Sequence, residues 1–320
     1  MDNSTHLKHQ NSRFPFAHTF SIVARDPETG ELGVAVQSHW FSTGSIVTWA
    51  EPGVGVVATQ SMVEVSYGPK GLAGMHDNRP PQEVLTKLLK ADESREVRQV
   101  AMVDSEGRVA VHTGSRCIAE AGHMSGEQYS VQANMMLRDS VWPAMARAFE
   151  ASTGKLPERL LAALDAAQAE GGDIRGMQSA AILVVSGKFS ETPWKETFVD
   201  LRVEDHPSPL VELHRLLKVQ RAYESMNAGD AFLAAGKMEE ALQAYQTGVQ
   251  AAPGIVELPF WQAVTLADTG RLTEALSIFK TVFAAEPNWA LLLQRLPKAG
   301  LLKDDAEMIA AILAQAKQTG

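Results

Sequence analysis

Two amide side chains, Gln132 and Asn134, are the first residues of this chain whose type and spacing point to chemistry. They lie two apart in the β-type run 128–136, and residues at i and i+2 of a strand face the same side of a sheet. Amide N–H groups aimed into a pocket stabilise the negative charge that develops on oxygen during acyl transfer. We expect the pair to line a pocket, with Asn134 in a catalytic role. The alternative is a hydrogen-bonded polar pair on an interior face.

The densest polar cluster of the chain is the segment 171–179, between an expected helix at 156–170 and an expected strand at 178–186. It contains Asp173 and Arg175. The two side chains could form an internal salt bridge that fixes the turn. Alternatively, they bind substrate, because the planar fork of an arginine matches a carboxylate with two parallel hydrogen bonds.

Further polar residues stand at the ends of other expected strands, where a pocket would collect them. We expect a substrate-binding role for Ser21, Ser38, Gln60 and Tyr67, with Gln37 beside them. The alternative for these residues is the ordinary alternation of a half-buried strand. The glycines from Gly68 to Gly74 precede a helix but lack the Gly-Lys-Ser/Thr ending of a phosphate-binding loop, so we expect only a tight turn there.

His123 lies in a loop rich in small and polar residues, with Cys117 six positions before it. We expect His123 to line the pocket as a third catalytic candidate, and a Cys117/His123 dyad is the alternative. The other histidines are scattered, and the pair His6 and His9 falls in the N-terminal arm. The sequence therefore predicts no metal site and no cofactor.

Composition limits the class of protein. The formal net charge of −9 argues against nucleic acid, whose phosphates require a basic face, and against an anionic membrane surface. No run of residues approaches the roughly eighteen apolar positions of a membrane span. A single cysteine fits a reducing compartment. The first eighteen residues are polar and unlike a secretory signal, so we expect a soluble cytoplasmic protein with no membrane partner.

The elements that must position these residues follow a simple order. Four β-type runs come first, at 19–26, 31–38, 46–50 and 54–60, and their succession without a helix predicts antiparallel pairing. Helical periodicity follows at 68–91, and three more strands are expected at 97–105, 108–114 and 128–136. Helices are then expected at 139–152 and 156–170, and a last pair of strands at 178–186 and 198–205. A doubly wound fold would alternate single strands and helices. We therefore expect an α+β domain of four layers, αββα, over residues 18–206, after a flexible arm at 1–17.

The C-terminal region, 207–320, is expected to be helical and repetitive. Seven residue pairs recur at a spacing of 34, among them Gly236 with Gly270, Tyr245 with Phe279 and Pro253 with Pro287. This period and pattern resemble the tetratricopeptide repeat. After a linker helix we expect repeats at 222–255 and 256–289 and a degenerate cap at 290–317. A peptide or protein partner at these repeats, and a homo-oligomer, are expected; an arbitrary helical bundle is the alternative.

The first domain resembles a widespread prokaryotic family of unknown function that is assigned to the Ntn (N-terminal nucleophile) hydrolase-like fold. The resemblance covers residues 18–205 and is carried by ordered motifs: TFSIVARDPETGELGVAVQS, WAEPGVGVVATQ, YGPKGL, RQVAMVDSEG, GHMSGEQYSVQANMM and GGDIRGMQSAAILVV. It implies the αββα fold but no settled activity. Members usually start Met-Thr-Phe-Ser-Ile, and the matching threonine here is Thr19.

An N-terminal threonine would be a nucleophile whose own amine is the base, and that amine has a reference pKa of about 7.7–8.0. Here eighteen residues precede Thr19, so its nitrogen is an amide unless the His18–Thr19 bond is cut. The lysine that proteasome-like members carry on the third strand is also absent from 46–50. The alternative for Thr19 is an ordinary β-branched strand residue.

Three functions compete on this sequence. The first is a hydrolase of amide-like C–N bonds in a small molecule, with Thr19 as nucleophile. The second uses the same pocket without cleavage of the chain, with a water activated by residues such as Asn134, His123 or Asp173. The third is a non-catalytic scaffold that binds a ligand in the first domain and recruits a partner through the repeats. We expect the hydrolase.

Overall fold

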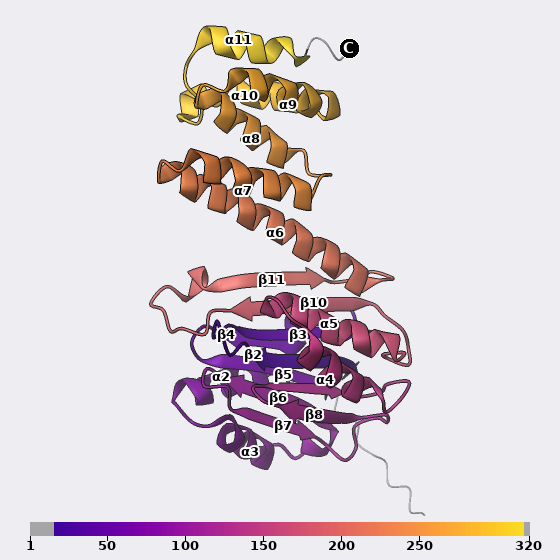
Figure 1. The fold of residues 1–320 in the computed structure, drawn as a ribbon. Coiled ribbons are helices and arrows are strands. Elements are labelled where there is room, and N and C mark those ends of the chain that lie inside the picture. The colour runs from indigo at the N-terminus through magenta and orange to yellow at the C-terminus, as the bar shows by residue number, and fades with distance from the viewer. Residues whose placement is uncertain (1–15, 317–320) are drawn as a thin grey trace, which may run out of the picture. The chain divides into compact units, whose positions relative to one another are not determined.

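The computed structural model describes residues 16–316, which form two compact units. The first unit ends at His214 and the second begins at Arg215. The first is built from two antiparallel sheets and four covering helices, and the second is helical (Figure 1). The mixed α/β class with antiparallel sheets and a helical C-terminal region is thus confirmed.

The larger sheet of the first unit has six strands, each antiparallel to its neighbours. Their spatial order is β11 (Thr197–Val203), β10 (Ser179–Val185), β3 (Leu32–Ser38), β2 (Thr19–Arg25), β9 (Tyr129–Ala133) and β8 (Gly122–Gly126). The central strands β2, β3 and β10 are buried almost throughout, because both faces of this sheet are covered.

The second sheet has five strands. Four follow the order β1 (Phe16–Ala17), β5 (Gly55–Met62), β6 (Arg98–Asp104) and β7 (Val109–Thr113), and β4 (Thr48–Glu51) also pairs with β5. Consequently β1 and β4 lie along the same edge of β5, at its end and its beginning. The chain therefore enters at the edge of one sheet and continues directly into β2 of the other.

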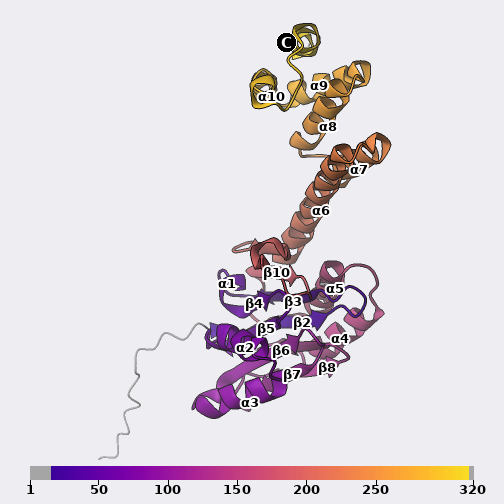
Figure 2. The ribbon, with the colours of Figure 1, turned by 90° about the vertical axis from the view of Figure 1, so that its left-hand side faces the viewer.

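Helices cover the outer face of each sheet. The pair α2 (Tyr67–His76) and α3 (Pro81–Ala91) contacts β5, β6 and β7, whereas α4 (Val141–Ala151) and α5 (Leu156–Ala169) contact β2, β3, β8 and β9. Between the sheets, valines from β2, β3, β5 and β6 form an apolar core. Figures 1 and 2 show the sheets stacked with a helix pair outside each, so the central strands are covered on both faces.

Two local elements differ from the sequence expectation. Residues 46–50 were expected to form a strand throughout, but a short helix α1 (Gly44–Val47) precedes β4, and the Thr48 hydroxyl donates back to the Gly44 carbonyl at 2.8 Å. Strand β8 was not expected, because GHMSG has no apolar alternation. Its five residues are extended because they pair with β9, a case in which neighbouring strands override intrinsic propensity.

The second unit begins in the long helix α6 (Pro209–Ala234), which starts within the first unit. It continues through α7 (Met238–Ala251), α8 (Glu257–Asp268), α9 (Leu272–Ala285), α10 (Asn288–Leu293) and α11 (Ala306–Ala314). The recurring residues have matching environments: Tyr245 and Phe279 are both fully buried, and Gly236 and Gly270 both adopt positive φ after a helix. None of the helices within residues 16–316 is long and apolar enough to cross a membrane.

Phe260 should be the side chain on which the stability of the helical unit depends most. It is fully buried against Trp261, Phe279 and Trp289. We expect Phe260→Ala to lower the free energy of unfolding by about 3–5 kcal/mol through the cavity it leaves. Leu291→Ala, at a side chain that is 55% exposed in the same unit, should change it by less than about 0.5 kcal/mol. Urea titrations monitored by circular dichroism measure both; equal effects would contradict this packing.

Candidate active site

The registers of the two sheets gather polar side chains at one end of the sandwich. In an antiparallel sheet the end of one strand lies beside the start of its neighbour. A polar residue at the end of one strand therefore lies next to a polar residue at the start of the adjacent strand. The paired positions are Thr19 with Ser38, Ser38 with Ser179, Ser21 with Gln132, and Gln60 with Gln99. All of these residues are fully buried. The structure thus brings together most of the polar residues that the sequence analysis selected.

Gln60 links the two sheets at this end. Its amide nitrogen donates to the Thr19 carbonyl at 3.1 Å and to Gln99 Oε1 at 2.7 Å. Its oxygen accepts from the Ser21 hydroxyl at 2.6 Å, and that hydroxyl accepts from Gln132 Nε2 at 2.6 Å. Gln132 therefore points into the network, although its amide N–H is already engaged by Ser21.

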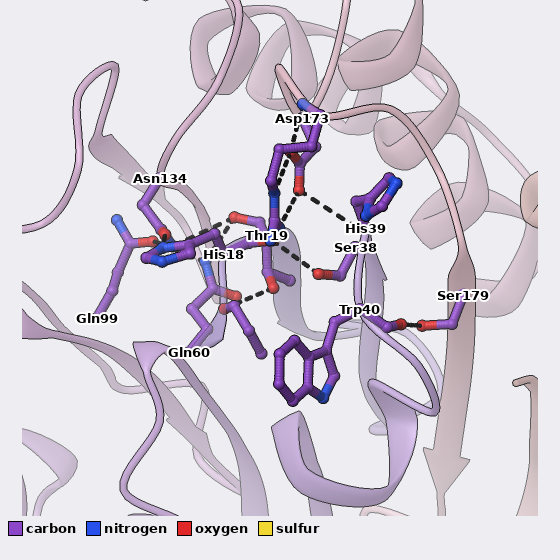
Figure 3. A network of polar contacts seen from close by, with 12 residues as sticks. His18, Thr19, Ser38, His39, Trp40, Gln60, Gln99, Asn134, Asp173 and Ser179 are labelled. Carbon is purple, nitrogen blue, oxygen red and sulfur yellow. Dashed lines mark hydrogen bonds and ion pairs between the residues drawn. The ribbon is translucent and has the colours of Figure 1, made fainter. Parts of the chain in front are cut away.

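Gln99 fixes the orientation of Asn134. The Gln99 amide nitrogen donates to Thr113 Oγ1 and to the Ala133 carbonyl, both at 2.9 Å, which leaves its oxygen to accept from Asn134 Nδ2 at 2.9 Å. Asn134 Oδ1 is consequently turned the other way, toward His18 Nδ1 at 2.9 Å (Figure 3). An amide with one end held by a buried neighbour cannot flip without losing a hydrogen bond.

Thr19 lies at the centre of this network and has no solvent exposure in the uncut chain. Its hydroxyl donates to the Ala17 carbonyl at 2.7 Å. Its own carbonyl accepts from the Asn134 backbone N–H at 3.1 Å and from Gln60. The surroundings of Thr19 are therefore polar rather than aliphatic, and they are closed to solvent.

Two donors converge on the carbonyl of the peptide bond that precedes Thr19. The Ser38 hydroxyl donates to the His18 oxygen at 2.7 Å, and Arg175 Nη2 donates to the same oxygen at 2.9 Å. Asp173 holds that arginine in place through contacts at 2.7 and 3.0 Å, and its carboxylate is fully buried. The Asp173–Arg175 pair is thus an internal salt bridge that also presents a guanidinium to a carbonyl oxygen.

His18 occupies the point where the chain passes from β1 in one sheet to β2 in the other, and its side chain is only 3% exposed. Burial lowers the pKa of His18, the hydrogen bond to Asn134 acts against this, and the positive charge of Arg175 lowers it further. The ring is therefore neutral near pH 7. Because Asn134 presents its Oδ1 atom, the Nδ1 atom of His18 carries the proton and donates a hydrogen bond to that oxygen.

Backbone strain flanks the network on two sides. Ser61 follows Gln60 with φ of 74°, and Met135 follows Asn134 with φ of 59°. Positive φ is uncommon for residues other than glycine, and such residues cluster at functional sites. The two strained positions support the view that this end of the sandwich is the site.

Two expected site residues lie elsewhere. Tyr67 packs in the core between α2 and the second sheet, where burial and the neighbouring Asp92, whose carboxylate it donates to at 3.2 Å, raise its pKa. His123 is exposed on β8, where it pairs with Gln132 of β9, and its ring is linked to the network by a hydrogen bond with Thr113 at 2.9 Å. Burial raises the pKa of Cys117, and none of the hydrogen bonds found within residues 16–316 joins it to His123.

The sequence analysis missed Gln99 and His18. A glutamine directly before the apolar run of β6 was a signal for Gln99, since a buried amide requires partners. His18 carried no signal, because its place depends on the chain passing between two sheets. As for metals, the described part of the chain contains no group of three His, Cys, Asp or Glu side chains that could hold an ion.

The helical unit contains a groove of about 790 Å³ between α7 and α9, with α8 at its base. Half of its lining residues carry an amide or a hydroxyl: Gln243, Gln246, Thr247, Gln250, Gln262 and Ser277. Arg271 bridges Glu274 at 2.6 Å and Glu239 at 3.5 Å beside it. This groove is the candidate surface for a partner of the repeats.

Comparisons with known proteins agree with this division of the chain. Residues 19–213 match the model of a family of unknown function, DUF1028, and residues 213–255 and 226–288 match a tetratricopeptide repeat model. A crystal structure of the protein SPO2555 from Silicibacter pomeroyi, titled with the same family, is 32% identical with a TM-score of 0.56, covering 62% of this chain and 88% of that chain. No curated protein matches. The chain therefore belongs to the family of unknown function DUF1028, and tetratricopeptide repeats follow its family domain.

Proposed function

We propose that the first unit is an Ntn-type hydrolase of amide-like C–N bonds and that its active form begins at Thr19. One observation carries the proposal: the carbonyl of the bond before Thr19 is held by two hydrogen-bond donors, Ser38 and Arg175. Such donors stabilise the oxyanion that forms when a nucleophile attacks a carbonyl. The sandwich of two antiparallel sheets between helix pairs, and the resemblance of its motifs to Ntn hydrolase-like proteins, support the same proposal.

Maturation is an intramolecular acyl shift followed by hydrolysis. Thr19 Oγ1 attacks the His18 carbonyl carbon, the C–N bond breaks, and the hydroxyl proton is transferred to the departing Thr19 nitrogen. This leaves the His18 acyl group as an ester on Thr19. Water hydrolyses the ester, so His18 ends in a carboxylate, and Thr19 has a free hydroxyl and a free amine.

The freed amine of Thr19 supplies the general base that the uncut chain lacks. Its reference pKa of about 7.7–8.0 is close to working pH, where a general base is most effective. The Thr19 hydroxyl, activated by this amine, attacks the substrate carbonyl and expels an amine, and water then regenerates the threonine. Gln60 and Asn134 hold the Thr19 carbonyl, which fixes the position of the nucleophile without a lysine on β4.

The repeats add a protein-interaction module to this enzyme. Tetratricopeptide repeats are stacked helix pairs that present extended binding surfaces, and the groove between α7 and α9 is such a surface. A scaffold without catalysis is the second candidate, because Thr19 is closed to solvent in the uncut chain. Activity that survives Thr19→Ala would instead favour a water-based mechanism at the same site.

Cleavage of the chain is the first prediction of this proposal. Intact mass spectrometry of the purified protein should find a species that begins at Thr19, together with or in place of the full chain. Thr19→Ala removes the nucleophile and should leave only the full chain. The control Thr29→Ala, at an exposed turn residue, should mature like the wild type. If the wild type stays uncut on prolonged incubation, an N-terminal amine cannot be the base.

Ser38 should govern the rate of this cleavage. Ser38→Ala removes one of two donors to the His18 carbonyl, and loss of one oxyanion donor slows comparable reactions by about 10²–10³-fold. Ser179→Ala is a matched control, because Ser179 pairs with Ser38 in the sheet but donates to the Trp40 carbonyl instead. Gel-resolved time courses give both rates. Similar slowing in the two variants would remove Ser38 from the chemistry.

The neutral His18 predicts a pH dependence of stability in the uncut Thr19→Ala chain. Because the folded pKa lies below the ordinary value near 6.5, the unfolded chain binds more protons and stability falls as pH decreases below that value. His18→Gln in the same background lacks this titration. The difference in Tm between the two chains should therefore shrink from pH 7.5 to pH 5. Parallel curves over this range would mean that His18 is not held neutral next to Arg175 and Asp173.

A further inference from the structure

The residues before Thr19 occupy the site as a substrate would. If the proposed maturation occurs, its ester intermediate is an acyl-enzyme whose acyl group is the peptide that ends in His18. Hydrolysis of that ester is then the same step that completes turnover of a substrate. A site that deacylates this group must accommodate it, so the contacts of residues 16–18 describe the acyl part of a substrate.

We infer that this site takes peptide-like amides whose acyl residue carries a neutral ring with a hydrogen-bond donor, as histidine does, at the end of an extended chain. The inference rests on the proposed function and names its substrate class. Three sets of contacts carry it: the side chain of residue 18, its carbonyl, and the strand that precedes it.

The side-chain contact sets the chemistry of the acyl residue. Asn134 Oδ1 accepts from His18 Nδ1 at 2.9 Å. The Asn134 amide cannot flip to present its nitrogen here, because Asn134 Nδ2 donates to Gln99, whose own amide is fixed by Thr113 and Ala133. The site therefore requires a donor from the acyl side chain. An acyl residue without one leaves a buried oxygen unpaired, which a site built for hydrogen bonding rejects.

Burial disfavours a cation at this position. It is the largest cause that lowers the pKa of His18; the charge of Arg175 lowers it as well, while the Asp173 carboxylate acts against both. Arg175 itself lies close enough to donate to the His18 carbonyl at 2.9 Å. A neutral imidazole therefore fits, whereas the permanently charged side chain of an arginine does not.

The main chain of the acyl part pairs as a strand. Ala17 lies opposite Ser61 and Phe16 opposite Met62, antiparallel at the edge of β5. When residues 1–18 leave, this stretch of β5 loses its partner, and an open strand edge is a template for an extended peptide. Recognition of main chain on one side and of a single side chain at Asn134 is the arrangement of a peptide-binding site.

The test uses the matured chain, repeats included, and two fluorogenic amides, acetyl-Phe-Ala-His and acetyl-Phe-Ala-Leu coupled to aminomethylcoumarin. We expect kcat/KM for the histidyl amide to exceed that for the leucyl amide by about 10–100-fold. Asn134→Ala removes the acceptor and should abolish the preference, mainly by lowering the rate with the histidyl amide. Equal kcat/KM values in the wild type, with measurable hydrolysis of both, would overturn the inference while leaving the hydrolase standing.

A binding measurement separates failure of the inference from failure of the proposed function. Calorimetry with acetyl-Phe-Ala-His and acetyl-Phe-Ala-Leu acids uses a chain that begins at residue 19 and carries Thr19→Ala, checked by circular dichroism for a cooperative unfolding transition. Preferential binding of the histidyl peptide without hydrolysis of either amide supports the acyl site and removes the hydrolase. Absence of binding and of hydrolysis overturns both.

Discussion

A buried amide loses free energy unless both of its ends are paired, and at the polar end of this sandwich that cost determines the geometry of the site. Gln60, Gln99 and Asn134 lie between the two sheets and are fully buried. Each orients the next, because a donor that points the wrong way would leave two polar atoms without partners. The Thr19 carbonyl and the Asn134 oxygen are placed by this chain of hydrogen bonds. Gln37 shows the opposite case, since it is buried on the helix-facing side with neither amide atom bonded within the described part of the chain.

The passage of the chain from one sheet to the other explains why residue 18 is special. β1 belongs to the edge of one sheet and β2 to the centre of the other, and only His18 separates them. Its carbonyl cannot join either ladder of strand pairing, so it is satisfied by Ser38 and Arg175 instead. The carbonyl of the peptide bond before Thr19 thus accepts hydrogen bonds from side chains, whereas most of the neighbouring peptide groups in β2 pair with the backbone of adjacent strands.

Much of this arrangement could be predicted from the sequence, and the limits have physical causes. Strands rich in valine and helices with one apolar face were located within a few residues, and the spacing of 34 identified the repeats. Ser21, Ser38 and Gln60 were selected because they stand at the ends of expected strands, and Gln132 and Asn134 because they lie two apart on one strand. Tyr67 was grouped with them from its place after β5, but α2 turns its ring to the outer face of the sheet. β8 could not be foreseen, because its extended form comes from pairing with β9.

The hydrogen bonds that orient the side chains of the site do not depend on His18. The bonds from Gln60 to Gln99 and from Gln99 to Asn134 involve no atom of His18, and Arg175 is held by Asp173 rather than by the His18 carbonyl alone. Loss of residues 1–18 would therefore free one acceptor on Asn134 and two donors on Ser38 and Arg175, while the side chains that carry them stay fixed. A site whose groups are oriented by each other is pre-organised, and this is why contacts to the chain's own residue 18 inform about contacts to a substrate.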